Sequence, residues 1–210
     1  MGNVSNESLI ALQKFRERVE LKKDEVINMW RNPPPPMMLA YGAVVLTSGV
    51  LFSAIGQWNV LGNFAWSDGL TSLLNLEFGK NGLEAKPGSQ RRVKDILTEI
   101  ARVVGLSGDT VNDLNEQFLQ LVQWNVIEDV NLHLSEQMRD RLADVLRAGG
   151  SDEDRSKSIN EFLKNASVDA YQAKGFLDYS VEKSLLQLSS VFEKAGYQGV
   201  VDKVKELITV

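Results

Sequence analysis

The sequence predicts an all-α protein with an N-terminal amphipathic helix, one transmembrane helix and a C-terminal compact helical bundle. Two observations carry this prediction. Apolar residues recur at helical spacing through most of the chain, with serine and glycine where helices should begin and end. In addition, no side chain from Asn32 to Ser67 is charged. The pattern divides the chain into an N-terminal segment, a membrane span, a juxtamembrane segment with a linker, and a bundle domain, at residues 1–36, 37–58, 59–88 and 89–210.

The N-terminal segment, residues 6–31, has the pattern of an amphipathic helix. A capping residue, Asn6 or Ser8, precedes acidic and apolar residues. Charged residues separate the apolar ones, which are Leu9, Leu12, Phe15, Val19, Val26 and Met29. Pro33–Pro36 should end this helix, because proline lacks the backbone N–H and clashes with the preceding turn. Four prolines in a row form a short, stiff polyproline spacer.

Residues 37–58 (MMLAYGAVVLTSGVLFSAIGQW) have the length and apolarity of a transmembrane helix. As a helix this segment would reach about 33 Å, and a bilayer has a hydrocarbon core of about 30 Å. Interior glycines also favour lipid over water, since each costs a soluble helix about 1 kcal/mol relative to alanine. The alternative is a soluble protein that buries residues 37–66 in its own core or in a partner.

Small residues share one face of the predicted span: Gly42, Gly49, Ser53 and Gly56. Such a face lets another helix approach closely, so it predicts packing against a second transmembrane helix. Tryptophans bracket the apolar run and are expected to anchor it at the two lipid–water interfaces: Trp30, Trp58 and Trp66. The alternative for the tryptophans is an ordinary position in a protein core.

Residues 59–88 join the span to the bundle. Residues 59–78 are about half polar and are expected to lie along the interface or on the next domain, and GKNGLEAKPG, residues 79–88, is the clearest linker. Serine, aspartate and glycine then divide the rest into helices, with starts at Ser89, Asp109, Ser135, Ser151 and Asp169 and a last short helix over 200–208. Apolar residues also alternate with period two between Val122 and Leu134, which leaves a strand open there.

The stretch from about Leu106 to Leu188 resembles a family of small all-helical domains of unknown function. The resemblance lies in a long apolar-rich helix (FLQLVQWNVIEDVNLHL), a short helix with its loop (SEQMRDRLADVLRAGGSDED) and the phrase INEFLKNASVDAYQAKGF. It implies a helical fold and no particular activity.

Composition and motifs point away from catalysis. The chain has no cysteine, and His133 is its only histidine, so neither a Cys/His metal site nor a Ser/His triad can be assembled. Asp152 is followed by acids, but the glycine and glutamate positions of a calcium loop are Lys157 and Leu163. A net charge of −5 argues against nucleic acid as a partner. We therefore expect no enzymatic activity, no cofactor and no bound metal.

The resulting expectation is a single-pass membrane-anchored structural or assembly subunit, whose partners are membrane lipid and other transmembrane subunits or further copies of itself. The alternative is a soluble all-helical binding protein. Near the span the N-terminal side carries Arg18, Lys22, Lys23 and Arg31, and the other side has no Lys or Arg before Lys80. The positive-inside rule then places the N-terminus on the cytoplasmic side and the helical domain on the opposite side.

Overall fold

The computed structural model describes residues 4–35, 38, 93–148, 151–166, 170–200, 202 and 204. In these ranges the chain forms six helices and no strand, which confirms the all-α prediction. The helices are α1 (Asn6–Asn28), α4 (Val93–Val104), α5 (Asp109–His133), α6 (Glu136–Arg147), α7 (Asp152–Asn165) and α8 (Ala170–Lys194). None of the described helices is both long enough and apolar enough to cross a membrane. The predicted span and the linker fall outside the described residues, apart from Met38.

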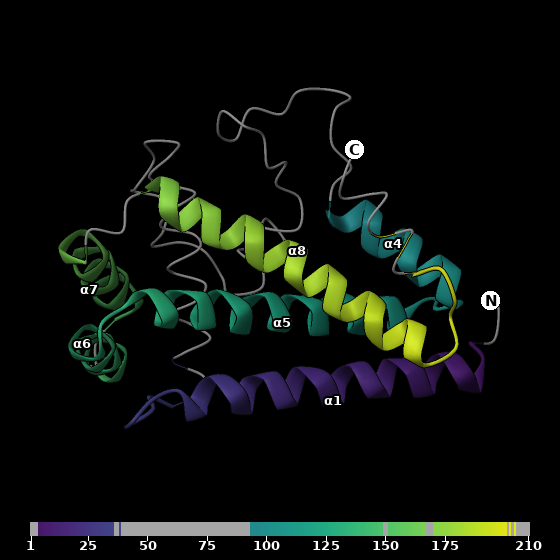
Figure 1. The fold of residues 1–210 in the computed structure, drawn as a ribbon, viewed down its shortest axis with the longest axis horizontal. Coiled ribbons are helices and arrows are strands. Elements are labelled where there is room, and N and C mark those ends of the chain that lie inside the picture. The colour runs from purple at the N-terminus through teal and green to yellow at the C-terminus, as the bar shows by residue number, and fades with distance from the viewer. Residues whose placement is uncertain are drawn as a thin grey trace.

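Helices α1, α5 and α8 form the centre of the fold (Figure 1). Helix α5 lies in the middle and packs against α8, α1 and α4. Helices α1 and α5 run in the same direction, and α8 is antiparallel to both. Helices α6 and α7 pack against each other where α5 ends, and α4 lies near the opposite end (Figure 1). The core therefore joins segments that are far apart in the sequence.

Most helix ends agree with the sequence signals. Ser5, Ser135 and Ser151 accept hydrogen bonds from backbone N–H groups in the first turns of α1, α6 and α7. Helix α4 ends at Gly105 in a Schellman motif, in which the Leu106 N–H donates to the Ala101 carbonyl at 2.8 Å. Gly105 has a φ of +77°, a conformation that favours glycine. The serines at 135 and 151 are the helix starts that the sequence predicts, but the residue that caps α1 is Ser5 and not the expected Asn6 or Ser8.

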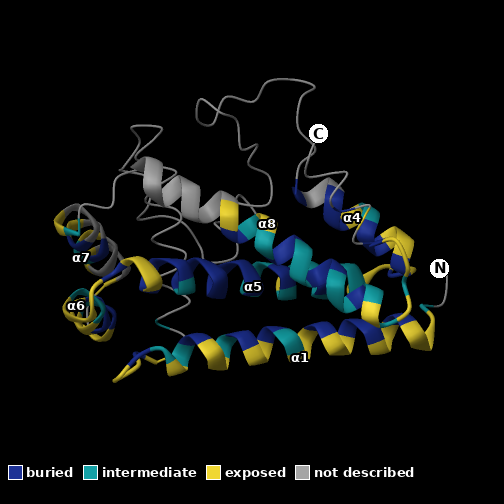
Figure 2. Ribbon diagram, viewed as in Figure 1, coloured by how far each residue is buried: buried dark blue, intermediate teal, exposed yellow. Residues whose placement is uncertain are grey.

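The buried face of α1 differs in part from the predicted one. Leu12, Phe15, Val19 and Val26 are buried, but Leu9 is 44% exposed. The buried stripe instead includes two polar side chains and, apart from the neighbouring Ala11, its members are separated by alternating steps of four and three residues: Ser8, Leu12, Phe15, Val19, Lys22 and Val26. This is the heptad spacing of helices that pack nearly side by side. Figure 2 shows the resulting division of α1 into a buried and an exposed side.

The packing of α1 into the bundle is a finding that the sequence pattern did not predict, since it treated residues 1–36 as a segment of their own. The Phe15 ring lies against the Phe192 ring of α8, with 6.3 Å between their centroids. The Ser8 hydroxyl donates to the Val104 carbonyl at 2.7 Å and lies 2.9 Å from the Tyr197 hydroxyl. Helix α1 therefore completes the core that α5 and α8 begin.

Helix α5 explains the strand-like alternation between Val122 and Leu134. Every residue from 121 to 127 is buried, because α5 is covered by other helices on several sides. A helix in that position needs no continuous polar face, so its sequence does not show the period of 3.6 clearly. The segment is helical as far as His133, and the strand alternative is wrong.

The docking of α1 predicts a large stability difference between two of its positions. Phe15→Ala removes a fully buried ring and should lower the free energy of unfolding by about 3–5 kcal/mol. Leu21→Ala alters the same helix where the side chain is 58% exposed, and should change it by less than about 0.5 kcal/mol. Urea denaturation of the two variants measures both. Equal effects would mean that α1 is not part of the core.

Candidate functional site

The most distinctive polar feature of the described residues is a chain of alternating charges across α1, α5 and α8, which we call the charge cluster. Its members are Arg18, Glu25 and Lys22 of α1, Glu128 and Asp129 of α5, and Lys183 of α8. Three cations alternate with three carboxylates, so the cluster is neutral overall. It brings together residues from the beginning, the middle and the end of the chain.

Lys22 and Glu128 form the centre of the charge cluster. The Lys22 ammonium lies 2.5 Å from the Glu128 Oε1 and 3.5 Å from the Glu25 Oε2. Its side chain is only 4% exposed, whereas that of Glu25 is half exposed. An ammonium group removed from water in this way is costly unless it is paired and hydrogen-bonded. Glu128 therefore determines whether Lys22 can occupy a core position.

Lys183 of α8 pairs with both carboxylates of α5, Glu128 and Asp129, and so connects Asp129 to the centre of the charge cluster. Its ammonium lies 2.6 Å from the Glu128 Oε2 and 3.4 Å from the Asp129 Oδ1. The second Asp129 oxygen accepts a 2.8 Å hydrogen bond from the Ser180 hydroxyl. Both oxygens of each α5 carboxylate are thus used, which is the condition under which a buried ionic network is tolerated.

A ladder of neutral hydrogen bonds continues from the charge cluster along α5 and α8. The Asn125 Nδ2 donates to the Ser184 hydroxyl at 2.8 Å and to the Gln187 Oε1 at 3.2 Å. The Ser184 hydroxyl donates to the Ser180 carbonyl at 2.6 Å. On α8 the ladder residues Ser180, Ser184 and Gln187 are three or four positions apart, and on α5 Asn125 lies four residues before Asp129, so the polar contacts fix α8 relative to α5 at consecutive turns.

The ion pairs outweigh burial in setting the protonation of the charge cluster. Burial alone would raise the pKa of Glu128, but the hydrogen bonds from Lys183 and Lys22 hold that pKa below its ordinary value of 4.5. Burial would likewise lower the pKa of Lys183, yet Glu128 and Asp129 raise it above 10.5. Both groups therefore stay charged at neutral pH.

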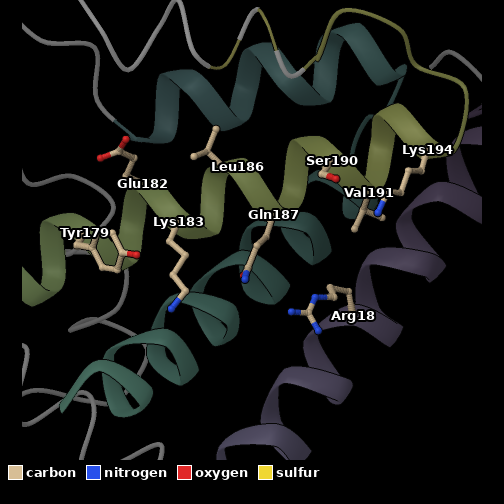
Figure 3. Close-up of a pocket in the computed structure, with 9 residues that line it drawn as sticks. All are labelled: Arg18, Tyr179, Glu182, Lys183, Leu186, Gln187, Ser190, Val191 and Lys194. Carbon is tan, nitrogen blue, oxygen red and sulfur yellow. The ribbon is translucent and has the colours of Figure 1, made fainter. Parts of the chain in front are cut away.

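A shallow groove with a volume of about 370 Å³ borders the charge cluster between α1 and α8. It is lined by Arg18, Tyr179, Glu182, Lys183, Leu186, Gln187, Ser190, Val191 and Lys194. Figure 3 shows Lys183 and Gln187 extending from α8 toward the side on which Arg18 lies. Arg18 already pairs with Glu25 at 2.9 Å, and Lys183 pairs with both α5 carboxylates. Two of the three cations of the groove are therefore already neutralised.

This arrangement is unsuited to nucleophilic or acid–base catalysis. Ser180 and Lys183 have the S-x-x-K spacing of some serine acyltransferases and hydrolases. Ser180, however, is fully buried, and its hydroxyl donates a hydrogen bond to Asp129. The raised pKa of Lys183 keeps this lysine protonated, so it cannot act as a base. Among the described residues no group of three or more His, Asp or Glu side chains is placed to hold a metal ion.

Of the predicted interfacial anchors and the candidate catalytic histidine, the structure describes Trp30 and His133. Trp30 is 6% exposed and belongs to the hydrophobic core, the alternative that the sequence left open, and its indole nitrogen has no hydrogen-bond partner within the described part of the chain. His133 is exposed at the end of α5, where its Nδ1 lies 2.7 Å from the Asp129 carbonyl oxygen. The small-residue face and the two other tryptophans, at Gly42, Gly49, Ser53, Gly56, Trp58 and Trp66, lie outside the described residues.

The charge cluster was missed by sequence reasoning. The sequence assigned no role to Glu128 or Asp129, and Lys22 was counted as one of several cations near the predicted span. One signal could have found it: Lys22 occupies a position where the four-and-three spacing of α1 calls for an apolar residue. Its closest partner, Glu128, lies more than a hundred residues away, so the identity of that partner could not be read from the local pattern.

Comparisons with protein-family models, with curated proteins and with solved structures found no match to this chain. The resemblance of residues 106–188 to a helical domain family therefore remains a prediction.

The burial of Lys22 predicts a sharp contrast between adjacent lysines of α1. Lys22→Glu places a third carboxylate beside Glu128 and Glu25, and should lower the free energy of unfolding by about 3–5 kcal/mol. Lys23→Glu makes the same charge change at a side chain that is 30% exposed, and should cost at most about 1 kcal/mol. Urea denaturation near neutral pH provides the comparison. Similar losses in both variants would contradict the described role of Lys22.

The depressed pKa of Glu128 predicts a specific pH dependence of stability. A carboxyl with a lowered folded-state pKa stabilises the fold above its unfolded value of 4.5, and this stabilisation is lost as the pH falls through the folded value. The difference in unfolding free energy between the parent chain and Glu128→Gln should be constant between about pH 6 and pH 8. It should shrink as the pH falls below 4.5. A difference that does not change on acidification would rule out this ion pair.

Proposed function

We propose that this chain is a membrane-attached structural or assembly subunit. The apolar segment that includes residues 37–58 holds it in the bilayer and packs against other transmembrane helices through Gly42, Gly49, Ser53 and Gly56. The helical bundle docks partner proteins on the membrane surface. This role needs no catalytic group, cofactor or metal.

The observation that carries the proposal is the absence of charge from Asn32 to Ser67. Soluble helices place charged or polar residues on the side that faces water, and a chain segment of this length normally includes several. The central 22 residues match the thickness of the bilayer core when they form a helix. Lipid is the environment that this composition fits best.

The chemistry of the bundle supports a structural role. Its strongest polar groups pair with one another across three helices, as Lys22, Glu128 and Lys183 do. Charges that are neutralised inside the fold contribute to its specificity and are not presented to a substrate. A rigid, self-contained helical domain is suited to holding other proteins in place.

The second candidate function is a soluble all-helical binding protein that buries residues 37–66 in its core or in a partner. The packing of α1 against α5 and α8 favours it to some extent, because both ends of the apolar segment are attached to one folded body. The two candidates differ in where the protein is found after cell lysis, so one experiment separates them.

Membrane attachment predicts the behaviour of a single central substitution. The parent chain should remain with the membrane fraction after an alkaline wash. Val50→Arg places a charge near the middle of the apolar segment and should add about 2.5–3.5 kcal/mol to its insertion, so a large fraction should move to the supernatant. Val50→Leu is the matched control and should behave like the parent. A parent chain that is soluble without detergent would exclude the membrane role and leave the soluble candidate.

A further inference from the structure

Helix α1 is held against the bundle along its whole length. Near its start, Ser8 binds the Val104 carbonyl, and in its middle the Arg16 guanidinium lies 2.7 Å from an oxygen of Asp113. Further along, Lys22 is paired with Glu128 of α5. Beyond its end, the Arg147 guanidinium of α6 donates to the Asn32 carbonyl. These contacts are spread along α1 from one end of the fold to the other, where α1 lies beside α5 (Figure 1).

The bundle is incomplete without α1. Its removal would uncover Phe192 of α8, a fully buried ring that lies against the Phe15 ring of α1. It would also remove one of the two ammonium groups that neutralise Glu128. Helices α1 and α5 can bury their apolar side chains and pair their buried charges only if both lie in the same compartment, on one side of any membrane.

This requirement determines how the intervening segment can meet a membrane. A chain that crosses a bilayer an odd number of times places its two flanks on opposite sides, where they cannot share a core. We infer that α1 and the bundle of α4–α8 lie on the same side of the membrane, and that the segment between Pro35 and Val93 enters and leaves the bilayer through the same face, as a hairpin. The inference rests on the proposed membrane attachment.

The charge pattern of the sequence supports the hairpin independently. No lysine or arginine occurs between Arg31 and Lys80, and the only charged residues in that interval are Asp68 and Glu77. Basic residues are present on both flanks, with Arg31 before the interval and Lys80, Lys86, Arg91 and Arg92 at and beyond its end. Under the positive-inside rule, two basic flanks around a segment without Lys or Arg place both flanks in the cytoplasm. Acidic residues contribute little to this rule.

The interval is also long enough for two passes. Residues 37–58 can reach about 33 Å as a helix, and residues 59–79 can reach about 31 Å. By length each can cross the hydrocarbon core of about 30 Å, and Asp68, near the middle of the second pass, must then face the first pass or another helix and not lipid. This arrangement replaces the expected placement of the helical domain on the side opposite to the N-terminus, which was based on the N-terminal cations alone.

Cysteine labelling in sealed vesicles tests the shared side directly, since the chain has no cysteine of its own. Glu17→Cys on α1 and Arg141→Cys on α6 change exposed residues, and each variant is treated with a membrane-impermeant maleimide in vesicles of known sidedness. Both should react when the reagent is on the cytoplasmic face, and neither when it is on the other face. Reaction of the two positions from opposite faces would overturn the inference.

Cross-linking in the same vesicles tests whether α1 is docked in the membrane-bound protein. Arg16→Cys with Asp113→Cys, two positions whose native side chains form an ion pair, should be joined by a short bismaleimide. Arg16→Cys with Arg141→Cys is the control and should not be joined, because Arg141 lies beyond the far end of α5, a helix about 37 Å long. Absence of the first cross-link, or equal formation of both, would overturn the inference.

An alkaline wash of the same vesicles distinguishes the two possible failures. If the protein moves to the supernatant, the proposed membrane attachment is excluded and the hairpin with it. If the protein stays with the membrane but the labels report opposite faces, membrane attachment stands and only the hairpin is excluded. Retention on the membrane together with labelling from one face supports both.

Discussion

The ammonium group of Lys22 lies in the interior of the fold, and most of the architecture can be derived from the need to neutralise it there. Glu128 reaches it from α5, and Lys183 of α8 approaches the other oxygen of the same carboxylate. Sliding any one helix by a single turn, about 5.4 Å, would separate at least one of these pairs and leave a charge unpaired in the core. The apolar contacts around the charge cluster are much less selective, since leucine and valine side chains pack in many registers. Specificity of alignment is therefore the main contribution that we ascribe to the buried charges.

Neutral polar contacts extend the same constraint in both directions along the bundle. Asn125 and Ser184 connect α5 to α8 beyond the charge cluster, and Ser8 connects the start of α1 to the end of α4. The pairing is not complete, because among the described residues neither the Asn131 amide nor the Asn125 Oδ1 has a hydrogen-bond partner, although both residues are buried. Each unsatisfied buried amide group lowers the stability of the fold.

The helices could be predicted from the sequence, and their assembly could not. Ser135 and Gly105 mark helix ends by local backbone chemistry, which acts over three or four residues and is therefore visible in the sequence itself. The docking of α1 depends on Lys22 meeting Glu128, two polar residues that a hydrophobic pattern assigns to the solvent-exposed side. The burial of α5 on several sides removed the polar face that would have distinguished a helix from a strand. Local signals determined the elements, and long-range pairing determined the site.

The order of synthesis adds a consequence for the way in which this fold is reached. Helix α1 is made before α5 and α8, whose residues cover its buried stripe and which follow after the segment between Pro35 and Val93. Until then the apolar side of α1, with the lysine within it, is exposed to solvent. The segment alone does not form a stable helix. Contacts so distant in sequence form slowly, because the intervening chain must be closed into a loop. A membrane hairpin would itself close this loop. Insertion of the segment between Pro35 and Val93 into the bilayer would bring α1 and α4 to the same membrane surface, so that α1, α5 and α8 would find one another sooner.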